Sequence, residues 1–333
     1  MTKGTKVFRI IISILLALTI LWGAFCTLVF VLFIDRYALK EKYGFSVAGV
    51  DVTFSNADDV LGDGTVTYDA YNNVLTLENA VIECEGTAIY SRIDLMIRLV
   101  GENKIAVSGE SITGIYASNY QLSKDLTFFG DGSLTIDYVG TCTDAMGIHG
   151  KNIRTESDIT INMPNCTNIV NGLYCESTLA VSKGATVTVN NGAGKYSTAV
   201  KARDNLHVEN GSSLIVNAAA GTTDVCKGLS VGGVLMIWDD STVKVTVDDS
   251  TAKAGECINA AGLVSLGKGA SLTASSKSAY AIECSGAMEL NPGSTVTAST
   301  EGEGTDLFCY GAIVDYGGTI NGEAEVLGDI HRK

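Results

Sequence analysis

The sequence predicts an all-β protein, a right-handed, single-stranded parallel β-helix (β-solenoid) of about nine coils. An N-terminal hairpin cap should close its first coil, and one N-terminal transmembrane helix should precede the cap. Three observations support this expectation: a repeat of roughly 27 residues, a composition suited to short strands, and one long apolar segment at the N-terminus.

The repeat is a small residue followed by an aliphatic one. The intervals between successive aliphatics are 26, 33, 25, 27, 29, 29 and 24 residues. Its copies are Ala88-Ile89, Gly114-Ile115, Gly147-Ile148, Gly172-Leu173, Ala199-Val200, Gly228-Leu229, Cys257-Ile258 and Ala281-Ile282. Because each coil of a solenoid covers only its neighbours, stacking such units creates a continuous core.

A second apolar pair, alternating with period two, follows each aliphatic at a regular distance. In six coils it begins six residues on, as at Leu95/Ile97 and Leu235/Ile237. In the other two it is expected eleven residues on, at Leu126/Phe128 and Ile159/Ile161. A third pair, such as Val187/Val189, often follows a glycine-containing turn. Period two indicates strands with one buried face, so each coil should hold two or three strands.

The composition fits the same fold and limits the partners. The chain has 37 glycines and only 2 prolines, which favours short strands joined by tight turns. It has 37 acidic and 23 basic residues, a formal net charge of −14. Such an acidic surface repels phosphate backbones, so nucleic acid is not an expected partner. Neutral polymers or divalent cations fit better, and calcium is a possible cofactor.

The apolar segment is expected to hold the protein in the cell membrane. Residues 10–34 form an uncharged run of 25 residues, enough to span a hydrocarbon core of about 30 Å. A cleaved signal peptide is the alternative, although its apolar region would be shorter. Residues 1–9 form a short basic tail that should stay inside, so a single-pass protein with an extracytoplasmic solenoid is expected.

The remaining chain divides into a linker, a cap and the solenoid. Residues 35–45 are expected to be a short linker, residues 46–85 a β cap, and residues 86–330 the parallel β-helix. Within the cap, residues 66–68 and 75–77 flank a mostly polar turn and should form a hairpin over the open sheet edge. Residues 310–327 are less regular and are expected to cap the last coil.

The cap and the coils, of the form G-I-Y…L-x-I…G-x-G-S-L-x-V, resemble those of Gram-positive surface proteins described as carbohydrate-binding β-helices. The resemblance covers roughly residues 47–330 and implies a pectin-lyase-like fold without catalysis. It implies binding of cell-wall or plant-type polysaccharide, in some relatives with calcium. No ligand motif of that family can be transferred residue by residue.

Stacking turns each position of the repeat into a column. If the aliphatics point inward, the residues two positions on do so too, and all but Val231 of these are small. The residues directly after the aliphatics then point outward and place rings on four consecutive coils. These rings are Tyr90, Tyr116, His149 and Tyr174. The small column Ala88, Gly114, Gly147 and Gly172 is expected to leave the backbone accessible beside them.

Cations and two inserted segments are expected to edge this strip. Arg92, Lys151 and Arg203 follow the ring position by two residues. The eleven-residue spacing would place extra residues at 118–124 and 151–157, which contain Tyr120, Lys124 and Arg154. Rings can stack on sugar faces, and cations can pair with uronate carboxylates. The alternative is that the rings only stabilise the sheet by packing on one another.

No complete catalytic site can be identified. The acidic pairs Asp239-Asp240 and Asp248-Asp249 fall where turns should close coils, although a glycoside hydrolase or a lyase needs clustered carboxylates or a positioned base. Gly-Ile-His-Gly at residues 147–150 is one copy of the repeat. Polysaccharide binding is therefore the first expectation. A scaffold that docks neighbouring membrane or envelope proteins is the alternative, and a polysaccharide lyase or hydrolase is the third.

The cysteines allow one or two disulfides. Cys142 and Cys166 precede their aliphatics by six and seven residues, so they could stack and pair, whereas Cys226 and Cys257 match less well. Cys175 and Cys284 fall on the small inward column and should be buried thiols.

Overall fold

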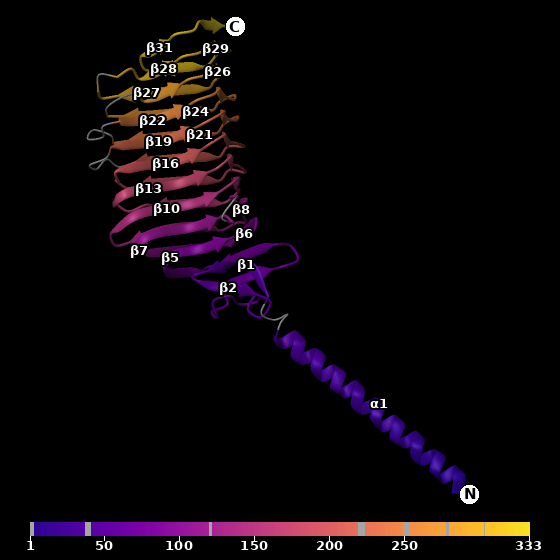
Figure 1. The fold of residues 1–333 in the computed structure, drawn as a ribbon. Coiled ribbons are helices and arrows are strands. Elements are labelled where there is room, and N and C mark those ends of the chain that lie inside the picture. Colours follow the sequence, from indigo (N-terminus) through magenta and orange to yellow (C-terminus); the bar gives the residue numbers. More distant parts are fainter. Residues whose placement is uncertain are drawn as a thin grey trace.

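The computed structural model describes residues 3–36, 41–119, 122–218, 224–248, 254–277, 280–302 and 304–333. Within the N-terminal helix, side-chain burial is described for Ile12 and for residues 14–29. Figure 1 shows a rod of stacked strands with a cap at one end, and a single long helix leaving from the cap.

The helix α1 runs from Lys3 to Arg36. Its described side chains are solvent-exposed, including Trp22 at 68%. Within the part of the chain that the structure describes, no helix meets the length and hydropathy needed to cross a membrane. The membrane-spanning role of residues 10–34 remains a prediction.

The rest of the described chain is an all-β parallel solenoid of the right-handed type, with about eight turns where the sequence predicted about nine. Short strands at the C-terminal end continue its ladders beyond the regular turns. The strands form one 20-stranded and one 12-stranded sheet.

The strands form three parallel ladders, numbered in the order in which the chain passes through them. The 20-stranded sheet contains the first and the third. The first ladder, which holds the aliphatic column, consists of β5 (Val81–Ser91), β7 (Glu102–Ala117), β10 (Cys142–Gly150), β13 (Cys166–Cys175), β16 (Tyr196–Ala202), β19 (Val225–Val231), β22 (Ala254–Ala260), β25 (Ile282–Cys284), β28 (Leu307–Cys309) and β31 (Ala324–Val326). The third ladder starts on the first halves of β5 and β7 and continues through β9 (Ser133–Val139), β12 (Asp158–Asn162), β15 (Thr186–Asn191), β18 (Ser213–Ala218), β21 (Thr242–Val247), β24 (Ser271–Ser276), β27 (Thr295–Thr300) and β30 (Thr319–Asn321).

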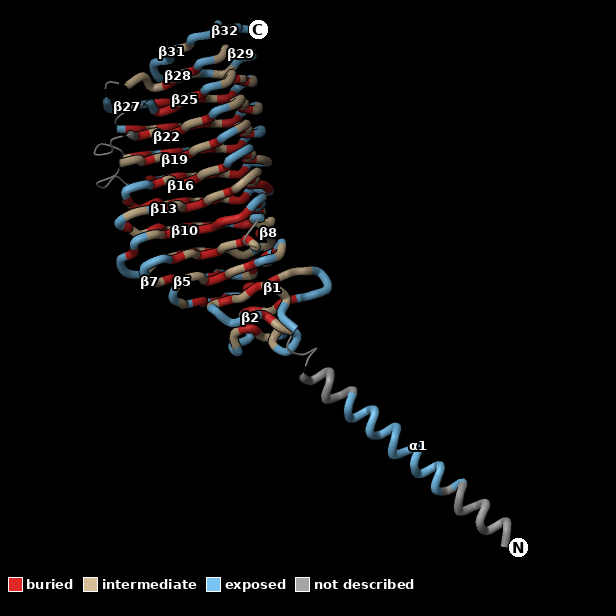
Figure 2. Tube along the Cα trace, in the orientation of Figure 1, coloured by how far each residue is buried: buried red, intermediate tan, exposed pale blue. Residues whose placement is uncertain are grey.

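The second ladder is the parallel part of the 12-stranded sheet. It consists of β4 (Val74–Glu78), β6 (Leu95–Val100), β8 (Leu126–Phe129), β11 (Ile153–Thr155), β14 (Thr178–Val181), β17 (Asn205–Val208), β20 (Leu235–Ile237), β23 (Val264–Leu266), β26 (Met288–Leu290), β29 (Ile313–Asp315) and β32 (Ile330–Arg332). A regular turn thus contributes one strand to each ladder, and the inward side chains of all three fill the core. Figure 2 marks the buried residues along these strands in red.

The aliphatic column is in register along the first ladder, as predicted. Ile89 pairs with Ile115, Ile148 pairs with both Ile115 and Leu173, and the column continues to Ile282 and beyond. The residues two positions on, from Ser91 to Cys284, are buried. Because these residues are small, the three strands of a turn can pack closely around a narrow core.

Antiparallel strands cover the N-terminal end. The predicted hairpin is confirmed as β3 (Val66–Asp69) against β4, with Val66 opposite Leu77 and Tyr68 opposite Leu75. The strand β1 (Lys42–Val47) pairs antiparallel with β5 and with β2 (Val50–Thr53). The cap therefore begins inside the range predicted as a linker, and it covers the first edges of two ladders.

Two predicted assignments are wrong. Residues 310–327 do not form a separate cap, because β29 to β31 continue the parallel ladders. Ile159/Ile161 belongs to the third ladder, opposite Leu134/Ile136. The second-ladder strand of that turn is β11, where Thr155 occupies the position of Phe128 and Val181 in the neighbouring strands. Because Thr155 is polar, the apolar alternation did not reveal this strand. Of the two turns predicted to place the second apolar pair eleven residues after the aliphatic, only the one at residues 118–125 does so.

Candidate functional site

The ring column predicted from the repeat lies on the outer side of the first ladder and forms one continuous stack. Tyr90 and Tyr116 have ring centroids 6.0 Å apart, Tyr116 and His149 are 4.7 Å apart, and His149 and Tyr174 are 5.3 Å apart. Their ring planes differ by 13 to 28°. In-register parallel strands place equivalent residues one above another, which produces this stacking.

The flat faces of these rings are largely occupied. Each inner ring lies between two others, and cations lie over the rings at both ends of the stack. The Arg92 guanidinium is 5.6 Å from the Tyr90 centroid, and the Lys201 ammonium is 5.2 Å from that of Tyr174. A ligand can therefore reach the edges and hydroxyl groups of the tyrosines more readily than their faces.

His149 is the least accessible ring of the stack, with 6% of its surface exposed. Its Nε2 lies 3.5 Å from Glu176 Oε1, and its Nδ1 has no hydrogen-bond partner within the described residues. Burial lowers the pKa of this imidazole because it disfavours the charged form, although Glu176 opposes the shift.

The small column beside the rings is not an accessible trough, which corrects the expectation. Ala88, Gly114, Gly147 and Gly172 are all buried. A Cβ on Gly147 would lie 2.1 Å from the carbonyl oxygen of Gly172 and 2.8 Å from Cγ2 of Ile161. These residues are small because neighbouring backbone and inward side chains approach them closely.

A groove lies beside the ring stack, where the first ladder turns into the second. Its volume is about 530 Å³. It is lined by Asp94, Leu122, Ser123, Lys124, Asp125, Lys151, Glu176, Ser177 and Asp204, which belong to the turns between β5 and β6, β7 and β8, β10 and β11, β13 and β14, and β16 and β17. The groove therefore follows the solenoid axis across five successive turns. We name it the axial groove.

Side chains hydrogen-bonded from turn to turn hold the base of the axial groove. Oδ1 of Asp94 accepts the backbone N–H of Asp125 at 3.0 Å. Oδ1 of Asp125 in turn accepts the backbone N–H and the Nδ2 amide of Asn152 at 3.2 and 2.9 Å. The Asn152 amide oxygen accepts the N–H of Thr178 at 3.3 Å. This ladder satisfies backbone donors at the corner and fixes the spacing of the groove residues.

The predicted cations fall into two groups. Within the described chain, Lys124 and Lys151 line the axial groove and form no ion pair. Arg154 instead lies on β11, in the other sheet, where its Nε is 3.0 Å from Glu156 Oε1, and Lys183 contacts the same carboxylate. Arg203 Nη1 is 2.7 Å from Glu176 Oε2. Tyr120 lies outside the described residues.

Asp239 and Asp240 lie on a turn, as expected, and Asp248 directly follows the end of β21. Oδ1 of Asp239 accepts the backbone N–H of Lys268 at 2.7 Å, and Asp248 pairs with Lys277 at 3.3 Å. Asp249 lies outside the described residues. Among the residues that the structure describes, no three His, Cys, Asp or Glu side chains gather closely enough to hold a metal ion.

The predicted pairing of Cys142 with Cys166 is confirmed as a disulfide between β10 and β13, with Cα atoms 4.8 Å apart. Cys175 and Cys284 are buried free thiols, also as predicted, and Cys226 and Cys257 are buried as well. Burial raises the pKa of the Cys175 thiol to about 11, which makes it a poor nucleophile.

Sequence reasoning missed the carboxylates of the axial groove. Asp94 and Asp125 directly precede the second apolar pair of their coils, and that shared position is the signal that could have identified them. No protein-family model, no curated protein and no solved structure matches this chain. The β-helix architecture implied by the family resemblance is present, and membership of a carbohydrate-binding family remains a prediction.

Proposed function

We propose that the protein is a membrane-anchored solenoid that binds a linear polysaccharide in the axial groove. The groove itself is the observation that supports this most strongly, because it runs along the repeat direction and offers similar groups at five successive turns. A polymer with a repeating unit can use such a surface many times, whereas a small ligand would use one or two turns.

The groove chemistry suits hydroxyl groups. Carboxylates accept hydrogen bonds and ammonium groups donate them, so the lining can satisfy a ligand whose hydroxyls do both. Asp204 and Lys151 are exposed, and the Leu122 side chain is 66% exposed and can cover the apolar face of a sugar ring. The Tyr116 and Tyr174 edges lie on the adjoining first ladder.

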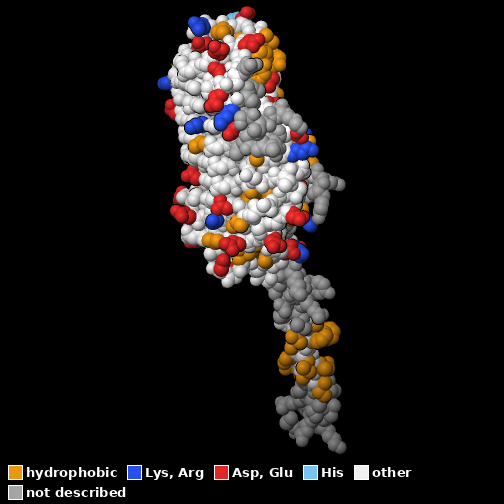
Figure 3. All heavy atoms as spheres, turned by 90° about the vertical axis from the view of Figure 1, so that its left-hand side faces the viewer, with side chains coloured by type: hydrophobic (Ala, Val, Ile, Leu, Met, Phe, Trp, Pro, Cys, Tyr) orange, Lys and Arg blue, Asp and Glu red, His pale blue; other side chains and the backbone are white. Residues whose placement is uncertain are grey.

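Charge favours a neutral polymer over a uronic acid polymer. Four carboxylates and two ammonium groups line the groove, and Arg154 and Arg203 already pair with glutamates. An anionic chain would meet a net negative surface on a protein of net charge −14. Figure 3 shows one further face, where uncharged polar side chains and backbone predominate and acidic groups are scattered.

The anchor is part of the proposal. We infer that α1 holds the chain in the cell membrane as a single span, with the solenoid on the extracytoplasmic side. The cap begins at Lys42, only a few residues after α1 ends at Arg36, so the solenoid would work close to the bilayer. A cell-envelope glycan would be within its reach.

Binding of the full chain in detergent micelles to a panel of neutral and uronic acid polysaccharides and peptidoglycan tests the proposal. Measurements with and without calcium test whether a cation assists. Lys124→Ala/Lys151→Ala should weaken binding of a neutral polymer at least about tenfold, through lost charge-assisted hydrogen bonds. Lys244→Ala, on the exposed side of β21, is the matched control. Wild-type affinity in the double variant, or no saturable binding, would refute the proposal.

The ring stack favours a second candidate function. The rings pack on one another and so stiffen a flat surface, which a neighbouring membrane or envelope protein could bind. A photo-crosslinking residue at Tyr116 should then give one discrete adduct in cells, and the same residue at Thr188 on β15 should not. A diffuse or absent adduct would contradict docking at this face.

The third expectation, lyase or hydrolase activity, remains a prediction, and assay of new reducing ends on the same panel tests it.

A further inference from the structure

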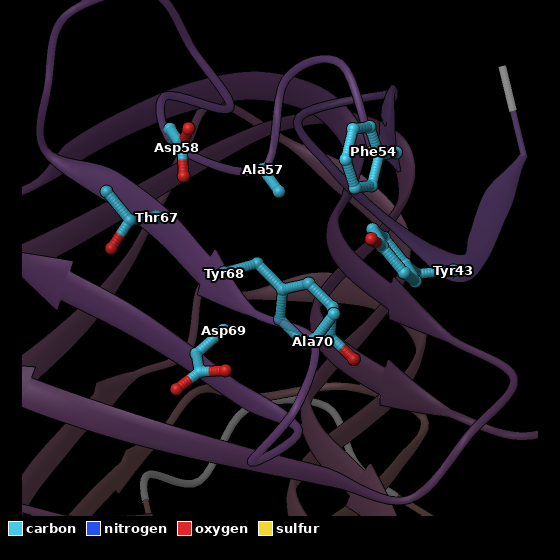
Figure 4. A pocket seen from close by; sticks show the side chains of 8 residues that line it. All are labelled: Tyr43, Phe54, Ala57, Asp58, Thr67, Tyr68, Asp69 and Ala70. Carbon is cyan, nitrogen blue, oxygen red and sulfur yellow. The ribbon is translucent and has the colours of Figure 1, made fainter. Parts of the chain in front are cut away.

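The cap contains a second hollow, whose lining residues precede those of the axial groove in the chain. Its volume is about 590 Å³, within the range of small-molecule sites. The residues that line it are Tyr43, Phe54, Ala57, Asp58, Thr67, Tyr68, Asp69 and Ala70. Figure 4 shows their side chains around one opening, with rings on one side and the two carboxylates on the other. We name it the cap hollow.

Aromatic rings form one wall of the cap hollow. The Tyr43 and Tyr68 centroids are 5.0 Å apart, and Phe45 supports Tyr68 from behind with an edge contact at 4.7 Å. The Tyr68 hydroxyl donates to Asn73 Oδ1 at 2.8 Å, which holds the ring in place. Phe54, on the turn after β2, is 62% exposed, so a ligand can reach its ring.

Hydrogen bonds fix the loop that carries Phe54 and Asp58. Asn56 Oδ1 accepts the backbone N–H of Thr53 at 2.7 Å. The Ala57 carbonyl accepts the N–H of Tyr68 at 2.7 Å, and the Val66 carbonyl accepts that of Val60 at 2.8 Å. The wall therefore exists before any ligand arrives, which lowers the entropic cost of binding.

The other wall is anionic. Asp58 and Asp69 line the hollow, and among the residues that the structure describes no lysine or arginine does. Hydrogen bonds from the Asn72 side chain and backbone lower the pKa of Asp69, so this carboxylate stays ionised at neutral pH. The nearest cation in the sequence, Lys42, contacts Asp51 instead.

We propose that the cap hollow binds an organic ammonium group, with its positive charge held between the rings of Tyr43, Phe54 and Tyr68 and the carboxylates of Asp58 and Asp69. A cation near an aromatic face is attracted by the ring quadrupole, and a carboxylate adds direct charge attraction. A hydroxyl group can also donate to a carboxylate, but it lacks the charge attraction that strengthens an ammonium contact, and an anion would be repelled. The inference does not depend on the axial groove.

The ammonium group can come from a free small molecule or from a lipid headgroup. The second source is in reach only if α1 anchors the chain, because β1 follows α1 closely and places the cap at that end of the rod (Figure 1). This arm of the proposal rests on the proposed anchor, whereas the soluble arm does not.

The test is calorimetric titration of the full chain in a non-ionic detergent with choline, with ethanolamine and with 3,3-dimethylbutanol, the neutral isostere of choline. At least one ammonium probe should bind saturably, and the isostere should bind at least about tenfold more weakly. Phe54→Ala/Asp58→Asn should lower ammonium affinity at least about tenfold. Tyr71→Ala and Asp63→Asn, in the same cap but outside the hollow, should not.

Equal binding of the isostere, no binding of either cation, or wild-type affinity in Phe54→Ala/Asp58→Asn would overturn the proposal. Thermal unfolding of each variant shows that the cap is intact. Sedimentation of the chain with vesicles of phosphatidylcholine or of phosphatidylglycerol then identifies the source. Binding to phosphatidylcholine vesicles that free choline competes away indicates the lipid headgroup. Binding of soluble choline without binding to these vesicles indicates a free ligand.

Discussion

At the scale of single residues, Gly147 and Gly172 determine how closely the ladders pack. A Cβ on Gly147 would meet the Gly172 carbonyl oxygen at 2.1 Å, and one on Gly172 would meet Val189 Cγ1 at 2.4 Å and the Ala199 carbonyl oxygen at 2.5 Å. Since backbone cannot move aside in a ladder, Gly147→Ala should lower the free energy of unfolding by about 2–3 kcal/mol. Urea unfolding measures this, with Thr188→Ala on the outer side of β15 as the control.

A Gly147→Ala protein as stable as the control would show that the turns can separate at this column. The sequence predicted the column but placed it outside, because small residues suit both a buried close approach and an open trough. Only the distances to neighbouring backbone distinguish the two.

His149 gives the protein a predicted pH dependence. Burial lowers its folded-state pKa below the ordinary value of 6.5, so the unfolded chain takes up a proton first as the pH falls. Its contribution to stability is fully present above about pH 6.5, and is lost as the pH falls from there through the folded-state pKa. His149→Phe should therefore lose less stability than wild type between pH 7 and pH 5.

Urea midpoints at pH 7, 6 and 5 test this, with Tyr174→Phe as a control that alters the ring stack but keeps His149. Parallel pH profiles for wild type and His149→Phe would contradict the account. The sequence placed His149 in the tyrosine column correctly, but its burial depends on side-chain contacts with Glu176 and two rings that spacing alone does not give.

At the scale of elements, the disulfide links two neighbouring strands. Cys142 on β10 and Cys166 on β13 are 24 residues apart in the chain. Closing a loop of that length restricts the unfolded state, so Cys142→Ser/Cys166→Ser should lower the free energy of unfolding by about 3 kcal/mol. Reductant should weaken the wild type to the same extent and leave the double variant unchanged. If reductant also destabilised the double variant, part of its effect would come from a source other than this disulfide.

Strand pairing was predictable wherever the pattern was apolar. The antiparallel hairpin, the first-ladder register and the Cys142–Cys166 pairing all followed from spacing. The β11 strand did not, because Thr155 buries a hydroxyl there and satisfies it locally. Its Oγ1 donates to the Ser157 carbonyl at 2.7 Å and accepts the Ser157 N–H at 3.3 Å. Local hydrogen bonding of this kind breaks the alternation on which the prediction relied.

At the scale of the whole molecule, repetition produces both candidate surfaces that follow the rod. One position per turn gives the ring stack, and the corner between the first and second ladders gives the axial groove. The sequence could predict the first because its residues share one place in the repeat. It placed Lys124 and Lys151 of the second at the edge of the ring strip, but it missed the carboxylates, because turn lengths differ from coil to coil and hide their shared place.

The length dependence of glycan binding tests the central claim most directly. Four steps of about 4.8 Å make the axial groove about 19 Å long across its five turns. Titration of the full chain with a size series of one neutral oligosaccharide should show affinity rising with each added unit until the ligand fills this length, and then levelling off. Equal affinity for the monosaccharide and the longest chain, or no binding at any length, would contradict a polymer site along the solenoid axis.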